Sequence, residues 1–252
     1  TKSNAHQANV VLDLTANEQH SFGVSARVFV SPNKRFENQA LSLNTNRQRQ
    51  LDSTFTTASG STRNTSNIAL NASHTFSLAN SETQLVTQAN YITYSADRVQ
   101  DVETNYFLPS GQQLRNNNFT TTGNQASTIL TGQIDLSAPL ISGALDWGLK
   151  ISDIKTSSAQ DFFDQTEQGA VLNPSLSDDF QYQENIFAAY FNITRDWEQW
   201  SLDLGLRAEQ TEVRATSKNL GEVNNQYYFE LFPKMSLLYT ANENNSFGLS
   251  YS

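Results

Sequence analysis

The sequence predicts an all-β fold, an antiparallel up-and-down meander of about ten strands. Three observations lead to this prediction. Apolar and polar residues alternate with a period of two along most of the chain. Short and long polar connections follow one another in strict alternation, about five times. Helical spacing of apolar residues is weak throughout.

Each strand-like run has one apolar and one polar face. In residues 200–209 every even position is apolar, and every odd position is polar or Gly. Residues 21–30 alternate in the same way except at Phe29, and residues 144–152 also alternate. Weaker alternation marks residues 68–76, where His74 interrupts the apolar face, and residues 130–136. Such alternation indicates strands that are apolar on one side only.

The connections between these runs are of two kinds. Short polar breaks, which we interpret as tight hairpins, lie near residues 16–20, 79–82, 138–142, 195–198 and 241–245. Longer polar connections span roughly residues 31–66, 96–126, 156–181 and 215–226.

This asymmetry favours a membrane barrel over a soluble sandwich. A soluble sandwich usually turns every ~8–12 residues, without long loops on one side. Outer-membrane barrels have short periplasmic turns, long external loops and strands of at least ~9–11 residues. We therefore expect strands of about 9–15 residues, belonging to an outer-membrane β-barrel.

Composition excludes several other classes. Of 252 residues only 16% are charged, and the net charge of −9 argues against a nucleic-acid partner. The chain has no Cys, so it has neither a disulfide framework nor a thiolate metal site. No apolar run approaches the ~18 residues of a membrane-spanning helix.

Apolar faces without charge and aromatic residues near the turns also indicate a membrane. Lys and Arg are absent from the faces that carry Leu202, Leu204 and Leu206, and Phe247 and Leu249. A cation facing lipid at the bilayer midplane would cost ~2–4 kcal/mol. Aromatic residues near the short turns are typical of interfacial girdles, although aromatic residues are common in any sheet. They include Trp197, Trp200, Phe22, Phe76 and Phe247.

The C-terminal third resembles TonB-dependent receptors of the outer membrane. Residues 182–192 (YQENIFAAYFN) and 200–211 (WSLDLGLRAEQT) are similar to two successive strands of that family. Residues 229–237 (FELFPKMSL) and 246–252 (SFGLSYS) are similar to the next two. The motifs cover roughly residues 180–252 and are fairly specific in combination and order. The upstream part matches only in its hairpin rhythm.

This resemblance implies the barrel of a receptor that imports a scarce nutrient across the outer membrane of a Gram-negative cell. It implies outer-membrane lipid, a plug domain, TonB and an unknown small ligand as partners of the full-length parent. No plug and no obvious TonB box are visible in residues 1–252. We therefore expect a barrel segment of a larger receptor.

The polar face of the later strands supplies the candidate site residues. If Leu202, Leu204 and Leu206 face lipid, then Asp203, Arg207 and Glu209 face the lumen, because strand side chains alternate. Glu184 is a further candidate on the preceding strand. An Arg between acids more often forms a structural charge ladder across strands than a ligand contact. An interface with the plug is a third role.

The sequence contains little that indicates a catalytic or metal-binding site. The three His residues lack metal-ligand spacing, and no catalytic triad or phosphate loop is present. Asp161, Asp164, Asp178 and Asp179 lie in one expected loop, where solvated acids are a better interpretation than a calcium site. We expect no enzyme activity, cofactor, metal or catalytic residue.

Two alternatives stay open at this point. One is a soluble secreted β module that binds carbohydrate through loop aromatics such as Tyr106, Phe107, Phe162 and Phe163. The other is a non-transport barrel that acts as an adhesin or structural protein.

Leu204 separates the membrane and soluble interpretations. Near the bilayer midplane, Leu204→Arg should lower the free energy of unfolding by ~2–4 kcal/mol, whereas Leu204→Phe should be tolerated. In the core of a soluble sandwich, Leu204→Phe would instead cost ~1–3 kcal/mol through overpacking. The measurement is the unfolding of the parent protein in lipid vesicles. A loss well above ~1 kcal/mol for Leu204→Phe contradicts a lipid-facing position.

Overall fold

The computed structural model describes residues 2–252, and their regular structure consists of antiparallel strands. None of these residues forms a helix of the length and hydropathy that a membrane-spanning helix requires. The strands are β1 His6–Thr15, β2 His20–Thr45, β3 Leu51–Ser77, β4 Gln84–Phe107, β5 Gln113–Leu140, β6 Gly143–Thr166, β7 Gly169–Leu172, β8 Asp178–Trp197, β9 Trp200–Ser217, β10 Glu222–Asn242 and β11 Asn245–Tyr251.

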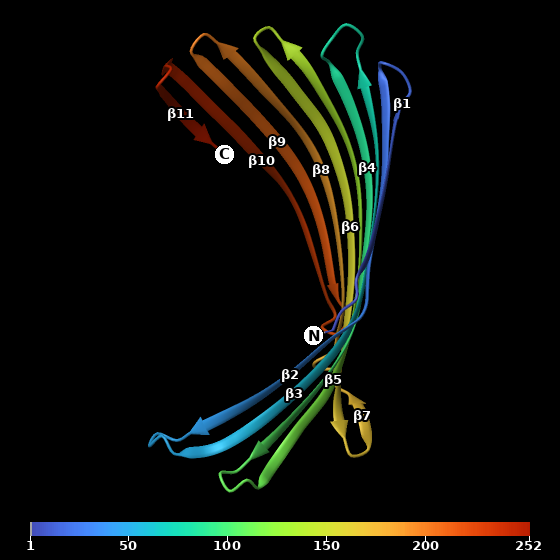
Figure 1. The fold of residues 1–252 in the computed structure, drawn as a ribbon, viewed down its shortest axis with the longest axis vertical. Helices are drawn as coiled ribbons and strands as arrows, with labels where there is room; N and C mark the ends of the chain where they lie inside the picture. The colour runs from blue at the N-terminus through green and yellow to red at the C-terminus, as the bar shows by residue number, and fades with distance from the viewer. Residues whose placement is uncertain (1) are drawn as a thin grey trace.

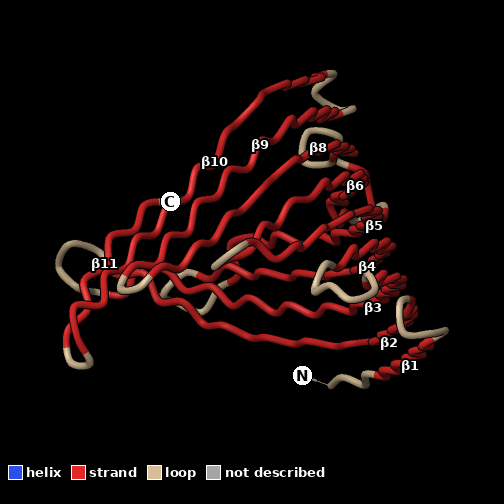
Figure 2. Tube along the Cα trace, turned by 90° about the horizontal axis from the view of Figure 1, so that it is seen from above, coloured by secondary structure: helices blue, strands red, loops and turns tan. Residues whose placement is uncertain are grey.

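All strands belong to one sheet, in which spatial order follows sequence order. The exception is the short strand β7, which pairs only with β6, so that β6 and β8 are direct neighbours. Figures 1 and 2 show a single curved layer that is open along one side, with β1 and β11 at its two edges. The predicted all-β meander is confirmed, with β7 as an additional strand.

The short turns lie where the sequence predicts them, and they gather at one end of the sheet (Figure 1). Local hydrogen bonds hold the first of them, since the Asn17 side-chain oxygen accepts the backbone N–H groups of Gln19 and His20, both at 2.9 Å. Asn favours turns because its side chain can bond to backbone groups a few residues away. In the two-residue turn between β8 and β9, Glu198 has a φ of 47°.

The long connections are a correction to the sequence prediction. We call the half of a strand that is distant from the short turns its far half. Residues 31–66 form the far halves of β2 and β3, with a turn only at residues 46–50. Residues 96–126 likewise form the far halves of β4 and β5. Residues 156–181 and 215–226 also lie largely in strands. Individual strands therefore reach 28 residues, beyond the expected 9–15. The far halves were missed because both of their faces are polar, so the apolar period of two disappears although the ladder of backbone hydrogen bonds continues.

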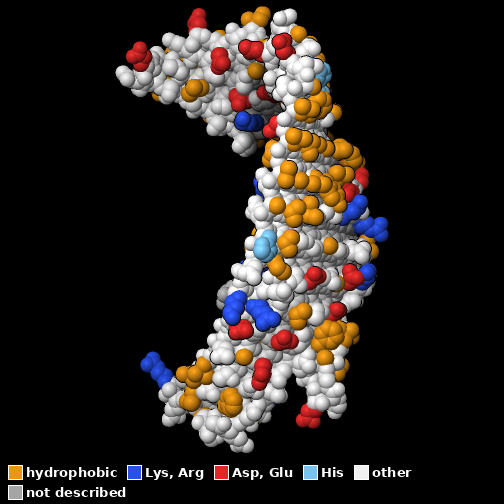
Figure 3. Space-filling view, turned by 45° about the vertical axis from the view of Figure 1, so that its right-hand side comes forward, with side chains coloured by type: hydrophobic (Ala, Val, Ile, Leu, Met, Phe, Trp, Pro, Cys, Tyr) orange, Lys and Arg blue, Asp and Glu red, His pale blue; other side chains and the backbone are white. Residues whose placement is uncertain are grey.

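Strand register defines two faces. We call the face that carries Leu202, Leu204 and Leu206 the outer face, and the opposite one the inner face. Cross-strand partners share a face. Leu204 is paired with Ile193 on one side and with Met235 on the other, so both of these residues also lie on the outer face. Figure 3 shows hydrophobic side chains gathered in a band across the convex side of the sheet, with charged groups next to it toward the long hairpins.

Two aromatic rows bound this band over β8–β11. Trp200, Tyr239 and Phe247 form one row near the short turns, and Phe187 and Phe229 flank Gln210 in the other. Ten residues of β9 separate Trp200 from Gln210, which is ~33 Å along the strand. With the usual strand tilt of ~40° the band is ~25 Å tall, the height of the apolar band in outer-membrane barrels.

The sheet has almost no core of its own. Ala96 and Ala188 are the buried apolar residues of the described chain. The accessible surface is 17261 Å², whereas a globular protein of 28.1 kDa exposes ~11,000 Å². The apolar residues of the outer band therefore need an external apolar medium.

Cysteine labelling of the parent protein in intact cells tests which end lies outside. Asn117 lies in the far half of β5, and Glu198 lies in the turn between β8 and β9. Asn117→Cys should react strongly with an impermeant maleimide and Glu198→Cys should not, because long hairpins of such barrels are external and short turns periplasmic. Lysed cells are the control, in which both should react. Equal labelling of both positions in intact cells contradicts the topology.

Candidate functional site

The four candidate residues lie on the inner face. On β9, Asp203, Arg207 and Glu209 alternate with the outer-face Leu residues. Glu184 of β8 is paired with Val213, an odd-numbered β9 position on the same inner face. The register therefore supports the predicted common face, and their contact with a lumen stays a prediction.

Arg207 is the centre of the first contact group. Its Nε donates to Glu209 Oε1, two residues along the same strand. Its guanidinium carbon lies 5.3 Å from the ring centroid of Tyr190, its cross-strand partner on β8. The Arg207 and Glu209 side chains are 34% and 20% exposed, so both charges are partly shielded from water. Glu209 is paired with Ala188, whose small side chain is buried.

Tyr190 extends this group across β6 to β5. Its hydroxyl donates to Asp135 Oδ1, although β6 lies between the two strands. Gly148 of β6, paired with both residues, makes this reach possible. A Cβ at Gly148 would lie 2.5 Å from Tyr190 Cζ, so the ring occupies the space of the missing side chain. An inward Gly covered by an aromatic ring is a known device for stabilising sheets.

The Asp135 carboxylate is satisfied on both oxygens. Gln133 Nε2 donates to its Oδ2 at 2.7 Å, while Tyr190 binds Oδ1. A chain of polar contacts thus runs from Gln133 through Asp135, Tyr190 and Arg207 to Glu209. We call these five residues the inner polar ladder.

Asp203 forms a separate pair with β10. Lys234 Nζ donates to Asp203 Oδ2 at 3.2 Å. The other oxygen, Oδ1, is buried and accepts no hydrogen bond within the described residues. A buried carboxylate oxygen without a hydrogen-bond partner is costly to the folded state.

Glu184 is remote from both groups. Six residues of β8 separate it from Tyr190, which is ~20 Å along the strand. It lies near Tyr182, beyond the aromatic row of Phe187. Desolvation raises the pKa of Tyr182 above its ordinary value of 10.0, and the Glu184 carboxylate acts in the same direction. The structure therefore brings Arg207 and Glu209 into one group, places Asp203 in a separate pair with Lys234, and leaves Glu184 apart.

The sequence prediction missed Gln133, Asp135, Tyr190 and Lys234, which complete the two groups. One signal was available: a Gly inside a strand often marks a close approach of neighbouring groups, and Gly148 interrupts the polar face of its run. The partner of Gly148 was not readable, because it depends on the register between strands that lie 42 residues apart in sequence.

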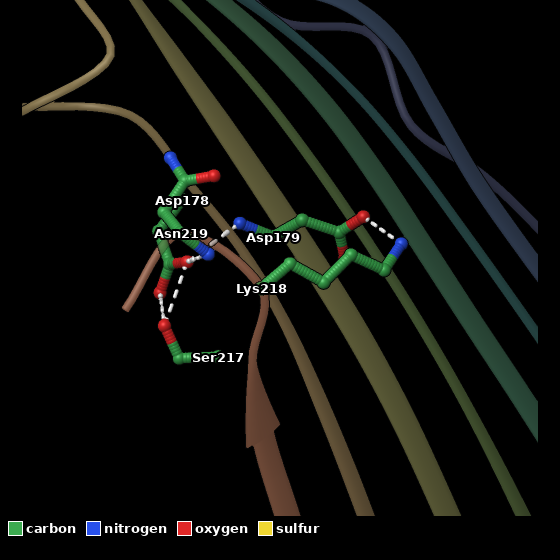
Figure 4. A network of polar contacts seen from close by, with 5 residues as sticks. All are labelled: Asp178, Asp179, Ser217, Lys218 and Asn219. Atoms are coloured by element: carbon green, nitrogen blue, oxygen red, sulfur yellow. Dashed lines mark hydrogen bonds and ion pairs between the residues drawn. The ribbon is translucent and has the colours of Figure 1, made fainter. Parts of the chain in front are cut away.

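The acids suggested as a loop calcium site have other contacts. The structure places Asp178 and Asp179 at the start of β8, not in a loop. Figure 4 shows Asp178 accepting hydrogen bonds from Ser217 Oγ, at 2.9 and 3.0 Å, and from the Asn219 backbone N–H. The adjacent Asp179 pairs with Lys218. These contacts fasten the β9–β10 turn to β8. Within residues 2–252, no three metal-ligating side chains gather into one group.

A comparison with known protein families agrees with this architecture. The model of a family described as "Outer membrane protein beta-barrel family" matches residues 74–252. No curated protein matches the chain significantly.

Several solved structures are similar. The ferric citrate transporter FecA is 11% identical, with a TM-score of 0.40, over 95% of this chain and 42% of that one. The ferric yersiniabactin uptake receptor FyuA from Yersinia pestis is 10% identical, with a TM-score of 0.44, over 96% and 43%. The siderophore receptor PiuA from Acinetobacter baumannii is 11% identical, with a TM-score of 0.37, over 99% and 49%. The chain spans less than half the length of each of these three proteins.

Gly148→Ala tests the contact between Gly148 and Tyr190. The added methyl group displaces the Tyr190 ring and strains its bond to Asp135, so we expect the free energy of unfolding to fall by ~1–3 kcal/mol. Gly132→Ala on β5 is the matched control, since its Cβ would lie 3.4 Å from the Ile151 side chain, close to ordinary contact. Urea unfolding of the parent protein in lipid vesicles measures both. Equal stability of the two variants contradicts the assigned contact.

Proposed function

The chain belongs to the outer membrane protein beta-barrel family and lies in the outer membrane, and we propose that it forms part of the barrel of a TonB-dependent receptor. In this proposal the full-length parent imports a scarce nutrient into a Gram-negative cell. Its partners are outer-membrane lipid, a plug domain, TonB and a small ligand. The four motifs within residues 180–252 support this choice within the family.

The observation that carries the proposal is the difference between the two faces. Over β9, the outer band from Trp200 to Ala208 has no charged residue, whereas the inner positions between them include Asp203 and Arg207. Charges on the inner face need water or a polar protein surface, because lipid would not solvate them. A plug domain inside the barrel supplies such a surface.

The inner polar ladder has a defined role in this proposal. Tyr190 and Arg207 are held by contacts across β5, β6, β8 and β9, so the wall presents fixed donors and acceptors. The ladder is thus an interface with a moving part, and ligand selection lies elsewhere. No step of this role is catalytic.

The alternative interpretation as a soluble carbohydrate-binding module is wrong, because the family to which the chain belongs lies in the outer membrane. Its four aromatic residues are also not on loops, since Tyr106 and Phe107 lie in β4, and Phe162 and Phe163 in β6. The Tyr106 ring centroid lies 5.5 Å from that of its cross-strand partner Phe55, and the Phe162 ring centroid lies 4.7 Å from that of its diagonal neighbour Phe119. An adhesin or structural barrel is the remaining alternative.

Gene deletion with transport measurements tests the proposal. We expect deletion of the parent gene to slow growth when one nutrient class, such as chelated iron, cobalamin or glycan, is limiting. Deletion of TonB should slow growth on that nutrient at least as much, and the double deletion should add nothing further. Import that continues without TonB contradicts the proposal. Normal growth on every limiting nutrient, combined with lost surface attachment, favours an adhesin.

A further inference from the structure

Three cations form one row on the inner face near the long hairpins. Lys34 of β2 is paired with Arg63 of β3, and Arg63 is paired with Arg98 of β4. Cross-strand partners project from the same face, so the three side chains are adjacent. Arg98 has the same parity on β4 as Asn90, whose side chain bonds to inner-face Thr131, so the row shares the face of the inner polar ladder. We call these three residues the cation row.

The cation row has no carboxylate partner. None of the four ion pairs among residues 2–252 includes Lys34, Arg63 or Arg98. Arg63 Nη2 donates to the Tyr94 hydroxyl and Arg98 Nη2 to Gln100 Oε1, both at 2.6 Å and both neutral groups. The Arg side chains are therefore oriented without being neutralised.

The nearest acids on β4 point away from the row. Asp97 and Asp101 occupy odd positions, so they project from the outer face, where Asp101 accepts a hydrogen bond from Thr120. On the inner face, the neighbouring positions of β3, β4, β5 and β6 carry hydroxyl, amide or apolar side chains. Like charges directly opposite each other destabilise a sheet. In a chain with 25 acids and 16 bases, three adjacent cations without an acid therefore need another explanation.

A hollow lies directly beside Arg63 and Arg98. Its volume is about 210 Å³, and its lining includes both Arg residues, Gly123, Gln125, Ser158 and Gln160. A Cβ at Gly123 would meet only Ala159 O, at 3.9 Å, so the floor of the hollow is open. The lining supplies guanidinium, hydroxyl and amide donors and contains no carboxylate.

We propose that the cation row binds an anion that carries two or more carboxylate or phosphate groups. The guanidinium fork binds such groups bidentately, and two adjacent forks suit a multiply charged ligand. The row spans two strand spacings, ~10 Å, which lets separated acidic groups bind at once. The inference rests on the proposed function in one respect, because it assigns the chemical class of the imported nutrient.

Calorimetric titration of the full-length parent protein in detergent micelles tests this inference. The probes are citrate and inorganic phosphate, with glucose as an uncharged control. Wild type should bind citrate, and binding should weaken with added salt. In the Arg63→Gln/Arg98→Gln variant the Kd for citrate should rise about tenfold or more, since each lost charge-assisted bond is substantial. Stronger binding of citrate than of phosphate identifies a polycarboxylate, and the reverse identifies a phosphorylated ligand.

A matched variant controls for net charge. Arg47→Gln/Arg115→Gln also removes two positive charges, one from the turn between β2 and β3 and one near the start of β5. The Arg115 guanidinium carbon lies 4.2 Å from the Tyr106 ring centroid. This variant should leave the Kd for citrate unchanged. Arg63→Gln/Arg98→Gln should also unfold at a higher temperature than wild type, because a repulsion is removed. An unchanged Kd in this variant, or no binding of either anion by wild type, overturns the inference. Binding that depends on the row, in a protein whose import needs no TonB, overturns only the proposed function.

Discussion

The exclusion of charge from the outer band of β9, β10 and β11 is the constraint on which the rest of the structure depends. Lipid solvates neither ions nor unpaired backbone groups, so a spanning sheet needs complete hydrogen-bond ladders and an apolar exterior. Along β9 the outer positions Leu202, Leu204 and Leu206 meet this requirement, and alternation sends Asp203 and Arg207 to the opposite face. The same alternation concentrates polar groups inside, where they bind one another.

The sequence predicted the elements that lipid constrains, and it failed where that constraint ends. The turns at residues 16–19 and 198–199 and the stripe around Leu204 were predictable, because alternation and polar breaks mark them directly. The far halves of β2 to β5 were not, because both of their faces are mostly polar and no apolar stripe marks them. Their stability comes from paired backbone groups and cross-strand contacts such as that between Thr57 and Thr104 Oγ1, at 3.1 Å.

The candidate site was predictable in its face and not in its contacts. Alternation alone assigns Asp203, Arg207 and Glu209 to one side of β9, and the register agrees. The bond between Tyr190 and Asp135 joins residues 55 positions apart, through a space created by Gly148 on a third strand. That contact depends on two registers at once, between β5 and β6 and between β6 and β8, and each shifts every partner when it slips by one residue. Glu184 was grouped with the others because period two fixes the face and carries no information about distance along the strand.

The order of the strands has a consequence for how the chain acquires its structure. Each strand pairs with its neighbours in sequence, apart from the insertion of β7, so every hairpin can form from adjoining segments without a distant search. Local pairing of this kind shortens the loops that must close and speeds assembly. Every intermediate nevertheless ends in a strand with unpaired N–H and C=O groups, which attracts other chains. During biogenesis the growing edge therefore needs a protective partner at each step, so that it pairs with the next strand of its own chain and not with another chain.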